Sequence, residues 1–342
     1  LSEKIADYLD ILRSRPRVLD IIRAELNEVK DKFAVPRRSE FAFGGVDMED
    51  EDLIEVEDMI VTVTHGGYVK RTPLSTYRTQ HRGGKGRSGM SMKDEDFVVN
   101  VFSATTHTEV LFFSSAGMVY KMKVYRLPVG TPQARGKAFI NLLPLKEGET
   151  ISTVMPLPED EETWGDLFVM FATASGYVRR NALSDFTDVR SNGKIAMKFE
   201  GDYAEDKLVR VRVCTEDDDI LLSVAGGKCI RFPVPDVRVF SGRSSHGVRG
   251  MRLPKGDELI ALSVVRHVKV DTEDRDAYLQ ARNAARRLKS GDYSERPEDK
   301  ARDEELAARL QEPKFAEMVE NEQFILTLTD DGYGKRTSAY EY

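Results

Sequence analysis

The chain has 342 residues, of which 51 are lysine or arginine and 58 are aspartate or glutamate, so its formal net charge is −7. Taken whole, this balance is unlike that of most nucleic-acid binders, which usually contain a basic domain. The length allows two or more domains, and no stretch approaches the roughly 20 uninterrupted apolar residues of a membrane span. The chain begins at Leu1 without a signal peptide, and we therefore expect it to be part of a longer protein.

Residues 1–34 have the apolar spacing of a helix with a heptad-like seam. The seam consists of Leu12, Leu19, Ile22, Leu26, Val29 and Phe33. Ser14 and Pro16 interrupt the pattern, which predicts one helix ending near Arg13 and a second from about Arg15 to Phe33, with Ser14 as its cap. A two-helix packing unit and the end of a coiled coil that continues upstream both fit. The uncapped start of the first helix favours the coiled coil.

Residues 40–58 contain nine acidic residues and no lysine or arginine. Such a run usually stays solvated and forms a linker or an edge. It follows the helical segment, residues 1–39, and precedes a β-rich segment that begins at residue 59. We therefore expect a separate domain over residues 59–342, joined to the helices by an acidic linker.

From Met59 onward, short apolar runs are each followed by a turn glycine and a second strand-like run. A lysine or arginine stands four residues after every turn glycine, and these glycines are Gly67, Gly117, Gly176, Gly227 and Gly332. A second marker rich in glycine and cations follows the first four, at residues 82–86, 135–138, 192–196 and 247–251. Strand repeats of about 50 residues are typical of β-propellers, because one blade cannot bury both its faces. The fifth unit stops at Tyr342 before its second marker, so we expect an incomplete ring.

Residues 267–322 interrupt the repeat with a helical pattern rich in charge. We expect a helical insertion in a blade loop. It is either mostly a solvated face or a surface with a regulatory or partner-binding role.

The segment 77–89 has the composition of a loop that grips a polyanion. Four of its residues from 83 to 89 are glycine, and Arg78, Arg82, Lys85 and Arg87 are interleaved with them. Glycine lets a phosphate approach backbone N–H groups while the cations neutralise its charge. The alternative is a flexible surface loop. The spacing of a nucleotide-binding P-loop is absent.

The surrounding sequence is basic although the chain is acidic. Residues 70–146 contain 13 lysines and arginines against four acids. Cations at equivalent points of successive blades would form a curved track for a duplex that does not depend on base sequence. Besides the box described below, the candidate contacts are Lys70, Arg71, Arg78, Arg87, Lys121, Lys123, Arg126, Arg135, Lys137, Arg179, Arg180, Lys194, Arg231, Arg249, Lys335 and Arg336.

Catalytic or metal-binding residues are not expected. The five histidines are scattered, and Cys214 and Cys229 form no C-x-x-C pair. Two cysteines in this length make neither a disulfide scaffold nor a zinc site, which favours a reducing cytoplasmic compartment. The run Asp217, Asp218 and Asp219 should be a solvated turn.

Seven residues resemble the GyrA box, usually Q-R-R-G-G-K-G, of the family of bacterial DNA gyrase A subunits. They are Gln80, His81, Arg82, Gly83, Gly84, Lys85 and Gly86, with His81 in place of an arginine. Residues 68–70, 114–117, 141–145 and 332–337 also look like that family. The resemblance covers nearly the whole chain except the insertion.

The resemblance implies a six-bladed β-pinwheel that wraps double-stranded DNA with positive handedness and feeds a second duplex segment through the cleavage gate. In the family, A subunits form a homodimer within an A2B2 complex, and the gyrase B subunit supplies ATP and Mg binding for negative supercoiling. The catalytic tyrosine lies upstream of this segment. The chain is therefore expected to bind and bend DNA without cutting it, with no cofactor of its own, near the nucleoid in the bacterial cytoplasm.

Two alternatives remain open. The A subunit of topoisomerase IV is a close one, but it lacks an intact box, so residues 80–86 argue against it. A propeller scaffold that binds proteins without an enzyme partner is another, and it would show no salt-dependent affinity for DNA. With its last blade missing, the chain should wrap DNA more weakly or over a shorter length than a complete domain.

Overall fold

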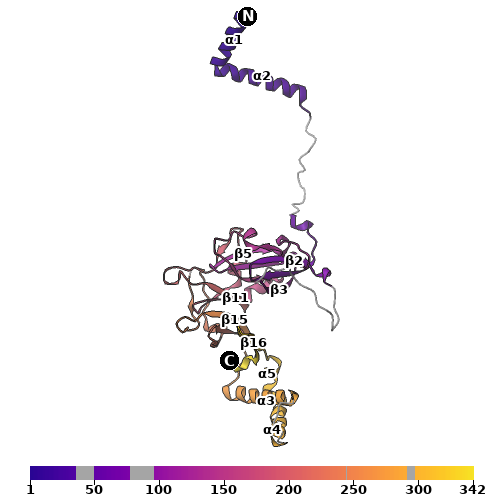
Figure 1. The fold of residues 1–342 in the computed structure, drawn as a ribbon, viewed down its shortest axis with the longest axis vertical. Coiled ribbons are helices and arrows are strands. Elements are labelled where there is room, and N and C mark those ends of the chain that lie inside the picture. The colour runs from indigo at the N-terminus through magenta and orange to yellow at the C-terminus, as the bar shows by residue number, and fades with distance from the viewer. Residues whose placement is uncertain (36–49, 78–95, 244, 291–296) are drawn as a thin grey trace. The chain divides into compact units, whose positions relative to one another are not determined.

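The structure, a computed structural model, describes residues 1–35, 50–77, 96–243, 245–290 and 297–342. The chain divides into two units, residues 1–53 and residues 54–342 (Figure 1). The predicted GyrA box at residues 80–86 lies outside the described residues, as do Arg78, Arg87 and most of the predicted acidic linker. Among the described helices, none combines the length and the apolar character that crossing a membrane would need.

Two helices make up most of the first unit, and their bounds agree with the sequence prediction. Helix α1 spans Ser2–Arg13 and α2 spans Arg15–Phe33. Ser14 occupies the cap position of α2, but its side chain accepts no capping hydrogen bond. Instead, the Arg17 guanidinium donates to Asp7 and Asp10 across the break between the helices. The apolar seam is exposed along both helices.

The second unit consists of successive antiparallel sheets, each built on one hairpin. All five predicted turn glycines adopt positive φ, which confirms the hairpin turns. Across the first sheet, the strands run in the order β3 (Val98–Thr105), β1 (Asp58–Thr64), β2 (Tyr68–Pro73) and β6 (Lys137–Ala138), and across the second in the order β10 (Lys194–Ile195), β5 (Met118–Lys123), β4 (Glu109–Ser114) and β7 (Ile151–Pro156). The third sheet has the order β11 (Leu208–Cys214), β8 (Phe168–Thr173), β9 (Tyr177–Ala182) and β14 (Val248–Arg249), and the fourth has β13 (Cys229–Pro233), β12 (Asp218–Val224) and β15 (Leu259–Arg266). The fifth is the hairpin of β16 (Phe324–Leu328) and β17 (Gly334–Ser338).

One edge strand of each of the first three sheets is donated by the following repeat. Strand β6 follows the second hairpin in sequence, yet it pairs with β2 of the first, with Lys137 opposite Val69. Strand β10 pairs in the same way with β5, and β14 with β9. The second marker of each repeat is therefore an exchanged strand, and neighbouring repeats are interlocked through backbone hydrogen bonds.

The exchanged strands need glycine immediately before them. Gly136 has φ +80°, and a Cβ there would lie 2.3 Å from the carbonyl oxygen of Val69. Gly247 has φ +101°, and its Cβ would lie 2.3 Å from the carbonyl oxygen of Val178. A side chain at either position would meet backbone rather than a side chain that could move aside. The glycines of the second markers are therefore needed because the backbones of neighbouring repeats approach each other closely at these positions.

Apolar clusters join each sheet to the next and give the domain its propeller-like stacking. One cluster combines Val61 and Phe112 from the first two sheets, and another combines Phe113 and Phe171 from the second and third. A third cluster joins the third and fourth sheets. The mainly β, propeller-like fold is confirmed. The described residues contain four sheets of three or four strands and one two-stranded hairpin, so the expected six blades are not confirmed.

The segment between β15 and β16 is helical, as predicted. It contains α3 (Thr272–Ser290), α4 (Pro297–Ala308) and α5 (Ala316–Glu320), coloured orange to yellow in Figure 1. Most of its described residues are exposed or half-exposed, as expected, but Tyr278, Phe315 and Met318 form a small core with Tyr340 of the fifth repeat. The Tyr340 hydroxyl also donates to the Met318 carbonyl at 3.2 Å. The insertion is thus fixed to the fifth repeat.

The exchange geometry predicts unequal costs for one substitution at two glycines of similar backbone conformation. Gly136→Ala must displace the backbone of β2, whereas Gly148→Ala, at φ +78°, has no atom within 4 Å of its new Cβ. We expect Gly148→Ala to lose about 1 kcal/mol of stability from the left-handed conformation alone, and Gly136→Ala to lose clearly more. Urea unfolding of both variants measures this difference. Equal losses would show that β6 does not constrain β2.

Candidate nucleic-acid interface

The cation three residues after the turn glycine is buried in the first and third repeats. Lys70 and Arg179 are both 0% exposed. Lys70 Nζ donates to the Thr131 carbonyl at 3.0 Å, and Arg179 Nη1 donates to the carbonyl of Ser245 at 2.7 Å. Both carbonyls belong to the loop that leads into the exchanged strand. These cations therefore hold the following repeat in place.

Burial also changes how readily these two groups carry their charge. Loss of hydration lowers the pKa of Lys70, and it lowers the pKa of Arg179 to about 10. Both side chains keep the N–H donors that the carbonyl contacts require.

The cation four residues after each turn glycine contacts the residue twelve positions earlier, on the partner strand of the hairpin. The partner is a carboxylate in the second and fourth repeats, an aromatic ring in the third and fifth, and a sulfur in the first. The pairs are Lys121 with Glu109 at 2.9 Å, Arg231 with Asp219 at 2.7 Å, Arg180 with Phe168 at 4.1 Å, Arg336 with Phe324 at 3.9 Å, and Arg71 with Met59 at 3.8 Å. The repeated cation thus braces its own hairpin.

These contacts change the set of cations available to a duplex. Lys70, Arg179 and Arg180 are at most 4% exposed and direct their charge at protein groups. We assign these three to the fold and omit them from the contact surface. The expectation of a solvated acidic turn was wrong for Asp219, which is buried against Arg231 and His267.

Most of the remaining candidate contacts are at least partly accessible. Lys137 and Arg249 are exposed on exchanged strands. Lys194 lies on the exchanged strand β10, where its Nζ donates to two loop carbonyls at 3.0 Å. Exposed or half-exposed positions elsewhere are Arg71, Lys121, Lys123, Arg126, Arg135, Arg231, Lys335 and Arg336. The exchanged strands therefore place cations along successive sheet edges.

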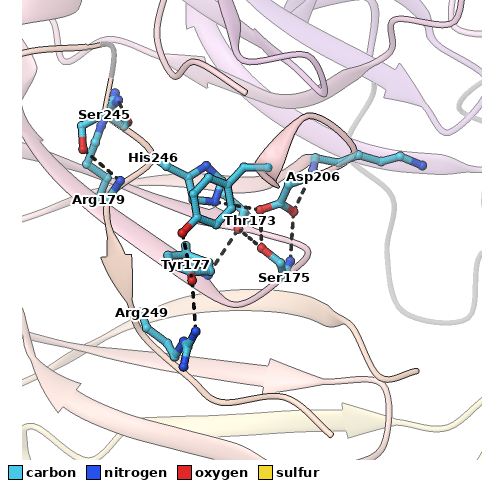
Figure 2. A network of polar contacts seen from close by, with 11 residues as sticks. Thr173, Ser175, Tyr177, Arg179, Asp206, Ser245, His246 and Arg249 are labelled. Carbon is cyan, nitrogen blue, oxygen red and sulfur yellow. Dashed lines mark hydrogen bonds and ion pairs between the residues drawn. The ribbon is translucent and has the colours of Figure 1, made fainter. Parts of the chain in front are cut away.

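A polar and aromatic cluster surrounds Arg249 (Figure 2). Arg249 Nη2 lies 3.2 Å from the hydroxyl of Tyr177, whose ring contacts His246 at 4.7 Å between centroids. Tyr203 also stacks on His246, with ring centroids 3.9 Å apart. His246 Nε2 is 3.0 Å from Asp206 Oδ2, although the pair is not aligned as a hydrogen bond. Three segments of the third and fourth repeats converge here.

Sequence reasoning missed a carboxylate that closes three of the hairpin turns. Asp96, Asp206 and Asp257 each accept a backbone hydrogen bond from the turn, at 2.7, 3.0 and 2.9 Å respectively. Each also accepts from the amide of its own following residue. An aspartate about 30 residues after the turn glycine and just before the third strand is the signal that could have revealed this clasp. It aligns the third strand with its hairpin.

The described residues contain no group of three or more histidine, cysteine, aspartate or glutamate side chains placed to hold a metal ion. Their repeated features are instead hydrogen bonds between repeats, braced cations and exposed edge cations.

Comparison with known proteins places these features in a family. The model described as the DNA gyrase C-terminal domain, a β-propeller, matches residues 58–105, 108–158, 168–215, 218–266 and 323–342. The first four matches each cover one hairpin with its third strand, and the insertion lies outside them. The chain belongs to this family.

Individual relatives agree with that assignment. The chain is 49% identical to the A subunit of DNA gyrase from Rickettsia bellii (strain RML369-C) and 46% identical to that from Granulibacter bethesdensis (strain ATCC BAA-1260 / CGDNIH1). Each comparison covers 100% of this chain but 37% of the relative, so the chain spans little more than a third of their length. It also resembles the crystal structure of a DNA topoisomerase IV C-terminal domain, with a TM-score of 0.52 and 26% identity over 63% of each chain.

The buried cations predict a position-dependent cost for one substitution. Lys70→Met and Lys335→Met alter the same repeat position, which is buried in the first repeat and exposed in the fifth. We expect Lys70→Met to cost about 1–3 kcal/mol for each carbonyl left without a donor, and Lys335→Met to stay within about 0.5 kcal/mol of wild type. Chemical denaturation measures both losses of stability, and equal losses would contradict the role of Lys70 in holding the following repeat.

A second prediction concerns pH. Burial lowers the pKa of His246 from its usual value near 6.5, although Asp206 opposes this shift. The unfolded chain therefore binds the proton more readily, so this contribution to stability is present above about pH 6.5 and is lost on acidification. His246→Phe preserves the ring stack on Tyr203 without a titratable group. The fall in Tm from pH 7.5 to 5.5 should be smaller in this variant, and an identical fall would refute the assignment.

Proposed function

We propose that the chain binds and wraps double-stranded DNA as the C-terminal part of a gyrase A subunit. The observation that carries this proposal is the recurrence of cations on the exchanged edge strands, within a chain that belongs to the gyrase C-terminal family. Wrapping requires contacts spread along an arc, because bending a short duplex costs a few kcal/mol that many contacts must offset. Interlocked repeats hold those contacts at fixed separations.

The contacts would be with the phosphate backbone. Lys137 and Arg249 extend from sheet edges, and lysine and arginine at such positions bind phosphates without reading bases. A wrapping surface has to accept any sequence, and edge cations meet that requirement. The predicted box at residues 80–86 corresponds in its repeat to the exchanged strands and would add a further basic segment.

The remaining roles belong to the longer protein. In this proposal the domain is part of a six-bladed pinwheel, and two A subunits assemble with two gyrase B subunits. ATP and Mg bind to that partner, the catalytic tyrosine lies upstream, and this chain needs no cofactor. The wrapped segment is passed through the cleavage gate to introduce negative supercoils in the bacterial cytoplasm. The similarity to A subunits of DNA gyrase supports this assignment.

The A subunit of topoisomerase IV is the second candidate, favoured by the structural likeness at a TM-score of 0.52. The higher identity to gyrase A subunits and the sequence of residues 80–86 support gyrase instead.

Salt dependence of DNA binding tests the first step of this proposal. We expect log K for a duplex of about 40 base pairs to fall steeply with log salt, because each neutralised phosphate releases counterions. Lys137→Gln should reduce the magnitude of the slope by about 1. Lys4→Gln, outside the β domain, is the control and should leave it unchanged. A flat salt dependence in the wild-type chain would instead indicate a protein-binding scaffold.

The role of the box is tested in the full-length protein reconstituted with the gyrase B subunit. Changing Arg82 and Lys85 to alanine should abolish ATP-driven supercoiling while relaxation and DNA cleavage persist, because wrapping is required only for the former. Supercoiling at the wild-type rate would show that the box does not act in wrapping.

A further inference from the structure

The residue after the turn glycine alternates in character along the repeats. It is Tyr68 in the first repeat, Tyr177 in the third and Tyr333 in the fifth. Met118 and Lys228 occupy this position in the second and fourth repeats. The position matters because the exchanged strand pairs there, with Tyr68 opposite Ala138 and Tyr177 opposite Arg249.

In the first and third repeats, the side chain of an arginine from the following repeat packs against this tyrosine. The Arg135 guanidinium lies 3.8 Å from the centre of the Tyr68 ring. The Arg249 guanidinium lies 5.6 Å from the centre of the Tyr177 ring and within 3.2 Å of its hydroxyl. In the second repeat, Ile195 takes the strand position of Arg249, opposite Met118, and Asn192 takes the position of Arg135 before its glycine. Neither residue carries a charge.

Both arginines retain capacity for an anion. Within the described part of the chain, neither Arg135 nor Arg249 lies within 4 Å of a carboxylate oxygen. Arg135 Nε is buried without a partner, and Arg249 Nη2 donates to the Tyr177 hydroxyl. The remaining guanidinium N–H groups of each arginine are the ones from which a phosphate can accept. Because the stem is already ordered, less side-chain entropy is lost when the phosphate binds.

The cluster around Tyr177 orders this platform further. Tyr203 is hydrogen-bonded to the Tyr177 hydroxyl, with 3.3 Å between their oxygens, and stacks on His246. Hydrogen bonds from Tyr203 and Arg249 lower the pKa of Tyr177, because both donors stabilise negative charge on its hydroxyl oxygen. Tyr177 is thereby fixed from both sides, as Figure 2 shows for His246 and Arg249.

We propose that Tyr68 and Tyr177 are positioning residues that hold Arg135 and Arg249 as ordered backbone-phosphate contacts on alternate repeats of the DNA-binding surface. This inference rests on the proposed binding of duplex DNA and adds which residues order the contacts. It also gives the surface a period of two repeats, in which the second repeat relies on Lys194 without an aromatic support.

The test uses duplex binding by the 342-residue chain across a range of salt concentrations. Arg249→Gln should weaken the Kd about five- to tenfold and reduce the magnitude of the salt slope by about 1. Tyr177→Leu should weaken the Kd about two- to fivefold with a smaller change in slope, since the charge remains but is less ordered. Tyr177→Phe retains the ring packing and removes only the hydroxyl, so its effect should be intermediate and unconfounded by folding.

Tyr333→Leu is the matched control. Tyr333 occupies the same repeat position and is 77% exposed, and the described residues place no arginine on its ring. The Kd of this variant should equal that of wild type. The double variant Tyr177→Leu with Arg249→Gln should bind as weakly as Arg249→Gln alone, because the tyrosine acts through the arginine.

The outcomes separate the two levels of the proposal. If wild type binds with a steep salt slope but both Tyr177 variants bind as tightly as Tyr333→Leu, the positioning role is overturned and DNA binding stands. Additive losses in the double variant would also overturn it, since the tyrosine would then contact DNA by itself. A wild-type chain without salt-dependent binding would overturn both inferences.

Discussion

The domain depends on one constraint, which is that each hairpin is completed by a short strand from the repeat that follows. An exposed edge strand presents unpaired N–H and C=O groups, and proteins generally cover or pair such edges. Here two residues are sufficient, because glycine brings the donated strand close and a buried cation fixes the loop before it. Lys70 and Arg179 make that second contribution by donating to carbonyls of the incoming loop. The strand pairing, the glycines and the buried cations together hold each repeat against the one that follows.

The same residue types serve two different purposes in the repeat. Buried cations hold the fold together, as Arg179 does by donating to the carbonyl of Ser245. Cations on the donated strands, such as Lys137, extend toward solvent. Because buried charges need partners, the first group contributes little field outside the protein. The potential available to a polyanion depends on the second group, which neither the net charge of −7 nor a count of basic residues distinguishes.

Local patterns predicted local structure well in this chain. The break at Ser14 gave the bounds of α1 and α2, and glycines such as Gly117 marked the hairpins through their positive φ. Strand exchange was not predictable in the same way, because Lys137 pairs with Val69, 68 residues earlier. Nothing near Lys70 in sequence indicates burial either, since its partner carbonyl belongs to Thr131. These features require contacts between repeats, and a single sequence does not report such contacts.

Because one edge strand of each of the first three sheets is donated by the following repeat, these repeats are completed in order from the N-terminus during synthesis. When the first hairpin leaves the ribosome, β2 has an open edge until β6 has been made, some 64 residues after the end of β2. The same delay recurs when β5 awaits β10 and β9 awaits β14. Each repeat is therefore completed only when the next one has emerged, and the newest hairpin is the part of the nascent chain most open to incorrect strand pairing.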